Sequence, residues 1–127
     1  MSYLLDTHTL IWYLEGNPKL STVVLEIIEK KDSVCFVSMA SLWELAIKSS
    51  LGRMEQAFLP ENLEEVLMVF EIPILPIRLS HLQTLMQLPM LHNDPFDRLL
   101  LAQAQTENLV FLSRDDQCKK YGIEMVW

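Results

Sequence analysis

Four acidic residues of this sequence could act together, because each stands near the end of a predicted strand or the start of a predicted helix. Asp6 directly follows one short apolar run, and Asp115 lies just beyond another. Glu44 and Asp97 fall in the first turns of two predicted helices. Carboxylates that converge repel one another unless some bind protons or a cation binds between them. Because hard divalent cations prefer oxygen ligands and retain several waters, the set predicts a Mg²⁺ or Mn²⁺ site suited to phosphodiester chemistry.

Each acid also has a purely structural interpretation. Asp6 could simply favour the N-terminal dipole of the first helix. Glu44 could pair with Lys48, four residues later on a solvated helix face, and taken alone this is the better interpretation. Asp94 is expected to be the N-cap of a helix that opens with a proline, and Asp97 then occupies a capping-box position. The functional hypothesis depends on all four acids reaching one edge of one sheet.

Other polar residues near these acids are expected to support them. Ser113 and Asp116 stand on either side of Asp115, and Asp116 ranks below it because it lies farther from the strand end and could cap a short turn. Arg98 and Arg114 follow or precede the acids directly and are candidates for phosphate contacts. A salt bridge to a neighbouring acid is the alternative for both arginines.

The elements that must position these residues alternate along the chain, which predicts βαβ units on a parallel sheet. Strands are expected at 3–5, 34–37, 74–75, 109–112 and 123–127. Helices are expected to begin after caps or capping boxes at Ser21, Asn62, Ser80 and Asp94. Gly16 and Gly52 are expected to end the first and third helices.

The order of the strands also follows from their composition. The runs at 3–5, 34–37 and 109–112 are apolar throughout, as strands covered on both faces should be. Prolines flank 74–75, and the final run alternates in polarity, so both suit the edges of the sheet. The predicted fold is therefore α/β, with a parallel five-stranded sheet of order 3-2-1-4-5 flanked by helices. Ligands of such sheets bind at the carboxyl ends of the strands where the winding reverses, here between the first and fourth strands.

Length and charge limit the classes of function. With 127 residues the chain is expected to form one domain, spanning 1–127. Its 10 basic and 17 acidic side chains give a net charge of −7, which argues against a broad, non-specific nucleic-acid binder. Any nucleic-acid substrate would have to be steered by a local basic strip, with Lys48 and Arg53 as candidates, or by a second copy of the chain. Two distant cysteines, no signal peptide and no apolar run of ~20 residues predict a cytoplasmic protein without a membrane span.

Other catalytic constellations are missing from the sequence. His8, His81 and His92 are scattered and lack the spacing of a zinc motif. The sequence has no P-loop and no serine in a nucleophile-elbow context.

Four segments of the chain resemble the motifs of PIN-domain nucleases, and in particular the VapC-type toxins of toxin–antitoxin pairs. They are Leu4–Trp12, Ser38–Lys48, His92–Arg98 and Leu109–Asp115, and they occur in the same order as in the family. One mild departure is Ser113, where the family often has threonine. The resemblance implies a single PIN-like domain that acts as a Mg²⁺-dependent endoribonuclease, with Mn²⁺ as a substitute. It also implies a homodimer held inactive by a small antitoxin protein.

The resemblance assigns roles to individual residues. It implies that Asp6, Glu44, Asp97 and Asp115 form the catalytic set, and Asp94 is an extra acid of one subgroup. In the mechanism expected for RNA hydrolysis, Asp6, Asp97 and Asp115 hold the metal ion directly or through water. Glu44 then positions a second ion or orients the attacking water.

Two other functions stay open at this point. One is a Mg²⁺-dependent phosphohydrolase or phosphoacceptor domain on a similar sheet, although Thr7 and His8 replace the DxD pattern of aspartate-nucleophile phosphatases. The other is a non-catalytic interaction module whose acids form a docking surface. A phospho-aspartate would support the first, and an RNA-cleavage assay decides the second.

Overall fold

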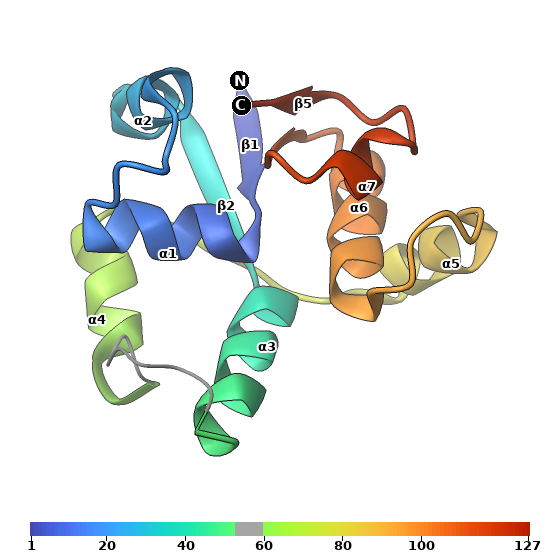
Figure 1. Cartoon of the computed structure of the whole chain (residues 1–127), viewed down its shortest axis with the longest axis horizontal. Helices are drawn as coiled ribbons and strands as arrows, with labels where there is room; N and C mark the ends of the chain where they lie inside the picture. Colours follow the sequence, from blue (N-terminus) through green and yellow to red (C-terminus); the bar gives the residue numbers. More distant parts are fainter. Residues whose placement is uncertain (53–59) are drawn as a thin grey trace.

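The computed structural model describes residues 1–52 and 60–127 and places helices between successive strands (Figure 1). The strands are β1 (Ser2–Leu5), β2 (Val34–Ser38), β3 (Ile74–Leu75), β4 (Val110–Leu112) and β5 (Met125–Val126). The helices are α1 (Thr7–Glu15), α2 (Thr22–Glu29), α3 (Met39–Ser50), α4 (Pro60–Val69), α5 (Leu79–Gln87), α6 (Pro95–Glu107) and α7 (Asp116–Lys119).

The strands form one parallel sheet in the order β3-β2-β1-β4-β5, which confirms the predicted topology. In the centre, Leu5 of β1 is in register with Leu112 of β4. The residues that follow these two strands therefore leave the sheet side by side, at the carboxyl edge where the direction of winding reverses. The backbone N–H of Asp6 still donates to the carbonyl of Leu112, at 3.1 Å.

Helices cover both faces of the sheet, so the central strands are apolar on both sides. Leu4 and Phe111 belong to a core shared with α6 and α7, whereas Leu5 and Leu112 belong to a core shared with α1, α2 and α4. Figure 1 shows α1, α2 and α4 on one side of the sheet and α5, α6 and α7 on the other. Neighbouring residues of a strand point to opposite faces, which is why these runs contain no polar alternation.

Helix starts are the part of the secondary structure that the local patterns predict least well. The expected cap at Asn62 is wrong, because α4 already begins at Pro60. The expected cap at Ser80 is also wrong, because Arg78 is the N-cap of α5. Its backbone N–H donates to Nδ1 of His81 at 3.0 Å, so a buried imidazole, and not a serine hydroxyl, fixes this start. The expected caps at Ser21 and Asp94 and the C-cap at Gly16 are confirmed.

Within residues 1–52 and 60–127, none of the helices combines the length and the apolar character that crossing a bilayer requires.

Candidate active site

The first carboxylate of the site is fixed at the junction between β1 and α1. Asp6 is the N-cap of α1, and its Oδ1 accepts a hydrogen bond from the backbone N–H of Thr7 at 2.6 Å. Its Oδ2 accepts a second bond from the hydroxyl of Ser113 at 2.7 Å. Ser113 comes directly after β4, so the pairing of the two central strands holds this carboxylate in one orientation. The predicted supporting role of Ser113 therefore has a definite geometry.

The second carboxylate lies just beyond β4. The backbone N–H of Asp115 donates to the Ser113 hydroxyl at 3.1 Å, so one serine contacts both Asp6 and Asp115. Asp115 Oδ1 accepts from the backbone N–H of Gln117 at 2.8 Å and caps α7, a helix absent from the sequence prediction. Asp116 is exposed and forms an ion pair with Lys119 at 3.1 Å, pointing to a surface role.

The start of α6 brings in the third carboxylate. Asp94 Oδ1 accepts from the backbone N–H groups of Phe96 and Asp97, at 2.8 and 3.1 Å, so Asp94 is the expected N-cap. Asp97 lies in the first turn, and its side chain is free to point toward the other acids. Its carboxylate Oδ2 lies 2.8 Å from Nε2 of His92. At the start of α6, the Asp94 side chain therefore bonds to the backbone, whereas the Asp97 side chain contacts His92.

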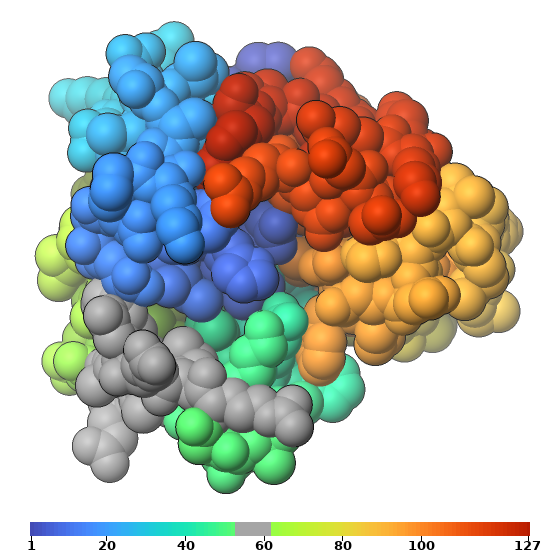
Figure 2. All heavy atoms as spheres, in the orientation of Figure 1, coloured from blue at the N-terminus to red at the C-terminus, as the bar shows by residue number. Residues whose placement is uncertain are grey.

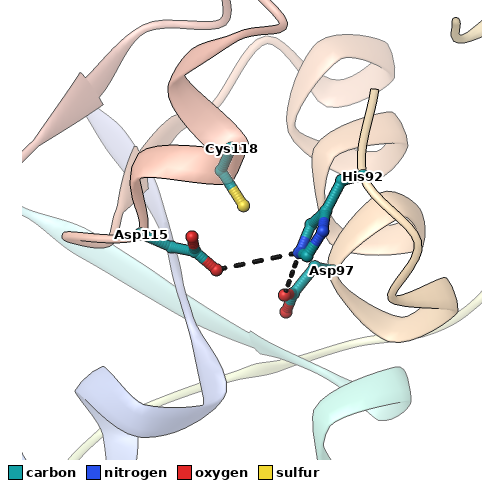
Figure 3. Close-up of side chains that lie close together, drawn as sticks. All are labelled: His92, Asp97, Asp115 and Cys118. Atoms are coloured by element: carbon teal, nitrogen blue, oxygen red, sulfur yellow. Dashed lines mark hydrogen bonds and ion pairs between the residues drawn. The ribbon is translucent and has the colours of Figure 1, made fainter. Parts of the chain in front are cut away.

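His92 joins two of the acids, although the sequence reasoning set it aside as a scattered histidine. Its Nε2 also lies 3.8 Å from Oδ2 of Asp115, and the close-up in Figure 3 shows the ring between Asp97 and Asp115. The hydroxyl of Tyr121 accepts from the backbone N–H of His92 at 3.0 Å and holds this loop in place. Ligand atoms of His92, Asp97, Asp115 and Cys118 all lie within 4.8 Å of one another.

Cys118 contributes a buried neutral thiol to this cluster. Burial and the neighbouring carboxylates both raise its pKa well above the ordinary value of a thiol. Because the thiolate is the form that binds metals or attacks as a nucleophile, Cys118 packs as an apolar residue here.

Glu44 enters from α3 and is buried at 8% exposure. The solvated-face interpretation is therefore wrong for Glu44 itself, although its Oε2 does pair with Lys48 at 3.2 Å. Its Oε1 is buried and has no partner among the described residues. One turn earlier on the same helix, Ser41 accepts a hydrogen bond from the hydroxyl of Thr7 at 2.9 Å, which ties α3 to the residue after Asp6.

The two arginines proposed for phosphate binding have different surroundings. A terminal nitrogen of Arg98 donates to the carbonyls of Leu85 and Leu88, at 3.5 and 3.0 Å, so this guanidinium fastens the end of α5. Arg114 is exposed, and its guanidinium carbon lies 4.5 Å from the centre of the Trp12 ring. The Nε of Arg98 is buried and has no partner among the described residues, so of the two arginines Arg114 is distinguished by its exposure. Arg53, expected in a basic strip with Lys48, lies outside the described residues.

The electrostatics of the cluster favour a cation. Burial is the main cause that raises the pKa of Asp97 to about 7, and the charges of Asp6, Asp94 and Asp115 add to it. Burial likewise raises the pKa of Asp6, against the opposing effect of the Ser113 hydrogen bond. Carboxylates are therefore held together at an energetic cost that a divalent cation would relieve. The carboxylate oxygens of Asp6, Asp97 and Asp115 are ligands of the kind that Mg²⁺ and Mn²⁺ prefer.

The fold and this arrangement of acids define the class of protein. The chain belongs to the PIN domain family, whose model matches residues 3–124. The predicted family and the predicted single α/β domain are thereby confirmed.

Several solved structures share the fold across nearly the whole chain. VapBC2 from Rickettsia felis, crystallised with a DNA fragment from their promoter, has a TM-score of 0.73 at 18% identity, covering 99% of this chain and 98% of that one. FitAcB from Neisseria gonorrhoeae has a TM-score of 0.70 at 21% identity, covering 100% and 97%. A toxin–antitoxin complex from Klebsiella pneumoniae has a TM-score of 0.67 at 17% identity, covering 98% and 96%. No curated protein matches the chain by sequence.

Proposed function

We propose that this PIN domain is a divalent-metal-dependent endoribonuclease and the toxin of a toxin–antitoxin pair. The observation that carries the proposal is the convergence of Asp6, Asp97 and Asp115 at the carboxyl edge of the two central strands. Three separate elements deliver these carboxylates, and burial raises the pKa of two of them. A fold needs no such cluster for its stability, and the acids' mutual repulsion disfavours it without a cation.

In this proposal Asp6, Asp97 and Asp115 hold Mg²⁺ or Mn²⁺, directly or through water. Such an ion, when bound, lowers the pKa of water and stabilises the charge that develops on a phosphate during hydrolysis. The backbone N–H of Thr7 and the hydroxyl of Ser113 donate to the two oxygens of Asp6 and keep this carboxylate in one orientation. His92 holds Asp97 in the same way from the other side.

The remaining groups act on the substrate and the water. The unpartnered Oε1 of Glu44 accepts a hydrogen bond from the attacking water and orients it, while Lys48 fixes the other oxygen. Arg114, which is exposed beside Asp115, contacts a phosphate of the RNA. Its position compensates locally for the net charge of −7, which would otherwise repel the substrate.

The proposed protein partner rests on the solved structures with the same fold rather than on the site. The solved neighbours were determined as VapBC, FitAB and toxin–antitoxin assemblies, and each spans almost the same length as this chain. We therefore propose a small antitoxin protein as the physiological inhibitor. The homodimer, which the resemblance to VapC-type toxins implies, stays a prediction.

The test is RNA cleavage by the chain purified free of any partner. We expect cleavage with Mg²⁺ or Mn²⁺ and none in EDTA. Asp6→Asn and Asp97→Asn should each lower the rate by ~10²–10⁴, the effect of losing several kcal/mol of transition-state stabilisation. Lys31→Ala, an exposed change far from the cluster, is the control for charge and preparation. Cleavage that persists in EDTA, or in both aspartate variants, contradicts the proposal.

A further inference from the structure

A hollow beside the carboxylates is lined mainly by side chains that metal binding does not use. It has a volume of about 270 Å³ and is lined by Asp6, His8, Thr9, Trp12, Arg114 and Asp115. In Figure 2 the blue α1 and the orange-red segment after β4 lie side by side on the face shown. Pockets that enclose a whole small molecule measure ~300–1,000 Å³, so this one suits a single unit of a larger ligand.

Trp12 gives this hollow a fixed aromatic wall. Its ring is half-buried and meets the ring of Trp127 edge-on, with the centroids 5.8 Å apart. On the side of the hollow, the exposed imidazole of His8 lies 5.8 Å from it at a tilt of 40°. An aromatic ring that is held by a neighbour and reaches the surface loses little entropy when a flat ligand stacks nearby.

Arg114 gives the same hollow a positive charge that no carboxylate of the described residues neutralises. Its guanidinium lies over Trp12, and it forms no ion pair with any described residue. Lys19 does not line the hollow, but its Nζ lies 5.9 Å from the centre of the Trp12 ring. By contrast, Lys48 and Lys119 are each paired with a carboxylate four and three residues away.

From this geometry we infer that the hollow binds the nucleobase next to the cleaved phosphate, stacked among His8, Trp12 and Arg114. The inference rests on the proposed ribonuclease function and names the residues that contact one base of the substrate. Proteins read single-stranded RNA by stacking splayed bases on aromatic rings or guanidinium planes, with Arg and Lys on the phosphates. Because Asp6 and Asp115 line the hollow as well as the metal site, a base bound here leaves its phosphate at the cluster.

Binding of short RNAs tests the inference separately from cleavage. All proteins carry Asp97→Asn, which protects the RNA, and fluorescence anisotropy in Mg²⁺ buffer gives the affinity for labelled pentanucleotides. One RNA is unmodified, and each of the others lacks the base at one position. We expect one abasic position to weaken binding by about 5- to 150-fold, the range that corresponds to ~1–3 kcal/mol of base stacking.

Variants of the hollow should then remove this difference selectively. Trp12→Leu should bind the unmodified RNA and that abasic RNA almost equally, whereas Trp12→Phe should keep most of the difference. Arg114→Ala should weaken binding of the unmodified RNA and of the abasic RNA, and it should reduce the slope of log affinity against log salt by about 0.7. Lys31→Ala should change neither the affinities nor the slope. Both RNAs are compared on the same protein, so a partly unfolded variant does not alter the ratio.

Three results would overturn the inference. If RNA binds but no abasic position matters, or if Trp12→Leu keeps the full difference, the hollow is not a base site and the proposed cleavage stands. If the unsubstituted chain neither cleaves nor binds RNA, the proposed function fails first and the base site with it.

Discussion

Replacing Asp97 by asparagine should stabilise the metal-free protein while it destroys activity. The pKa of Asp97 is about 7 in the folded chain, against an ordinary value of 3.8. A tenfold change in proton affinity is worth ~1.4 kcal/mol, so ionising Asp97 in the folded state costs ~4 kcal/mol at most. The amide of the variant never ionises, but it also replaces the acceptor of the 2.8 Å contact with His92. We therefore expect a net gain of about 2–4 kcal/mol above pH 7.

The pH dependence gives the sign of this effect. A carboxyl group whose pKa is raised by folding stabilises the folded protein at pH values below its pKa in the unfolded chain. This stabilisation is lost as the pH rises through its pKa in the folded chain. The metal-free wild type should therefore lose stability between about pH 4 and pH 7. Asp97→Asn should not show the decrease in stability that ionisation of Asp97 causes, and at pH 8 it should melt at a higher temperature than the wild type.

The assay is thermal melting in EDTA from pH 4 to pH 8, beside an RNA-cleavage rate in Mg²⁺. Asp94→Asn is the matched control, because asparagine is as good an N-cap as aspartate and the change removes one neighbouring charge. Asp94→Ala should lower the free energy of unfolding by about 1 kcal/mol through loss of the N-cap, and it should retain measurable cleavage. A lower melting temperature for Asp97→Asn at pH 8, or near wild-type cleavage by it, would refute the assignment of Asp97. Loss of cleavage in Asp94→Ala alone would reverse the roles of the two acids.

Three further outcomes are expected. Expression of the chain without its partner should arrest growth, and Asp6→Asn should relieve the arrest. Colony counts measure growth, and immunoblotting checks that both proteins are present at an equal level. Growth arrest by the variant would contradict a metal-dependent toxin. Ser113→Ala should lower the free energy of unfolding by ~1–2 kcal/mol, because a buried carboxylate oxygen of Asp6 loses its donor. It should also move the acidic limb of the cleavage profile to higher pH, because the hydrogen bond lowers the pKa of Asp6. Ser113→Thr should restore both the stability and the pH profile. Glu44→Gln should reduce the cleavage rate at least tenfold with a melting temperature within a few degrees of wild type; an unchanged rate would remove Glu44 from the catalytic set.

The sheet and its central acids could be predicted because their signals are local. Apolar runs long enough for a buried strand identified β1, β2 and β4, and prolines beside 74–75 moved β3 to an edge. Once the strand order was inferred, the carboxyl ends of β1 and β4 had to be neighbours, and Asp6 and Asp115 followed from chain connectivity alone. The N-cap role of Asp94 was equally local, because a capping side chain contacts backbone within its own turn.

The remaining features depend on contacts between distant segments. His92 sits in an irregular loop with no periodicity, and Tyr121, 29 residues later, holds that loop against the cluster. Arg98 follows Asp97 directly, but it turns to the carbonyls at the end of α5 because α5 packs against α6. The start of α5 is set by the buried ring of His81 rather than by Ser80. Local spacing in the sequence determined which residues of this protein could cap a helix, form an i, i+4 pair or follow a strand. Only the tertiary structure decided which side chains face the carboxylates, because their orientation depends on contacts between segments that are far apart in the sequence.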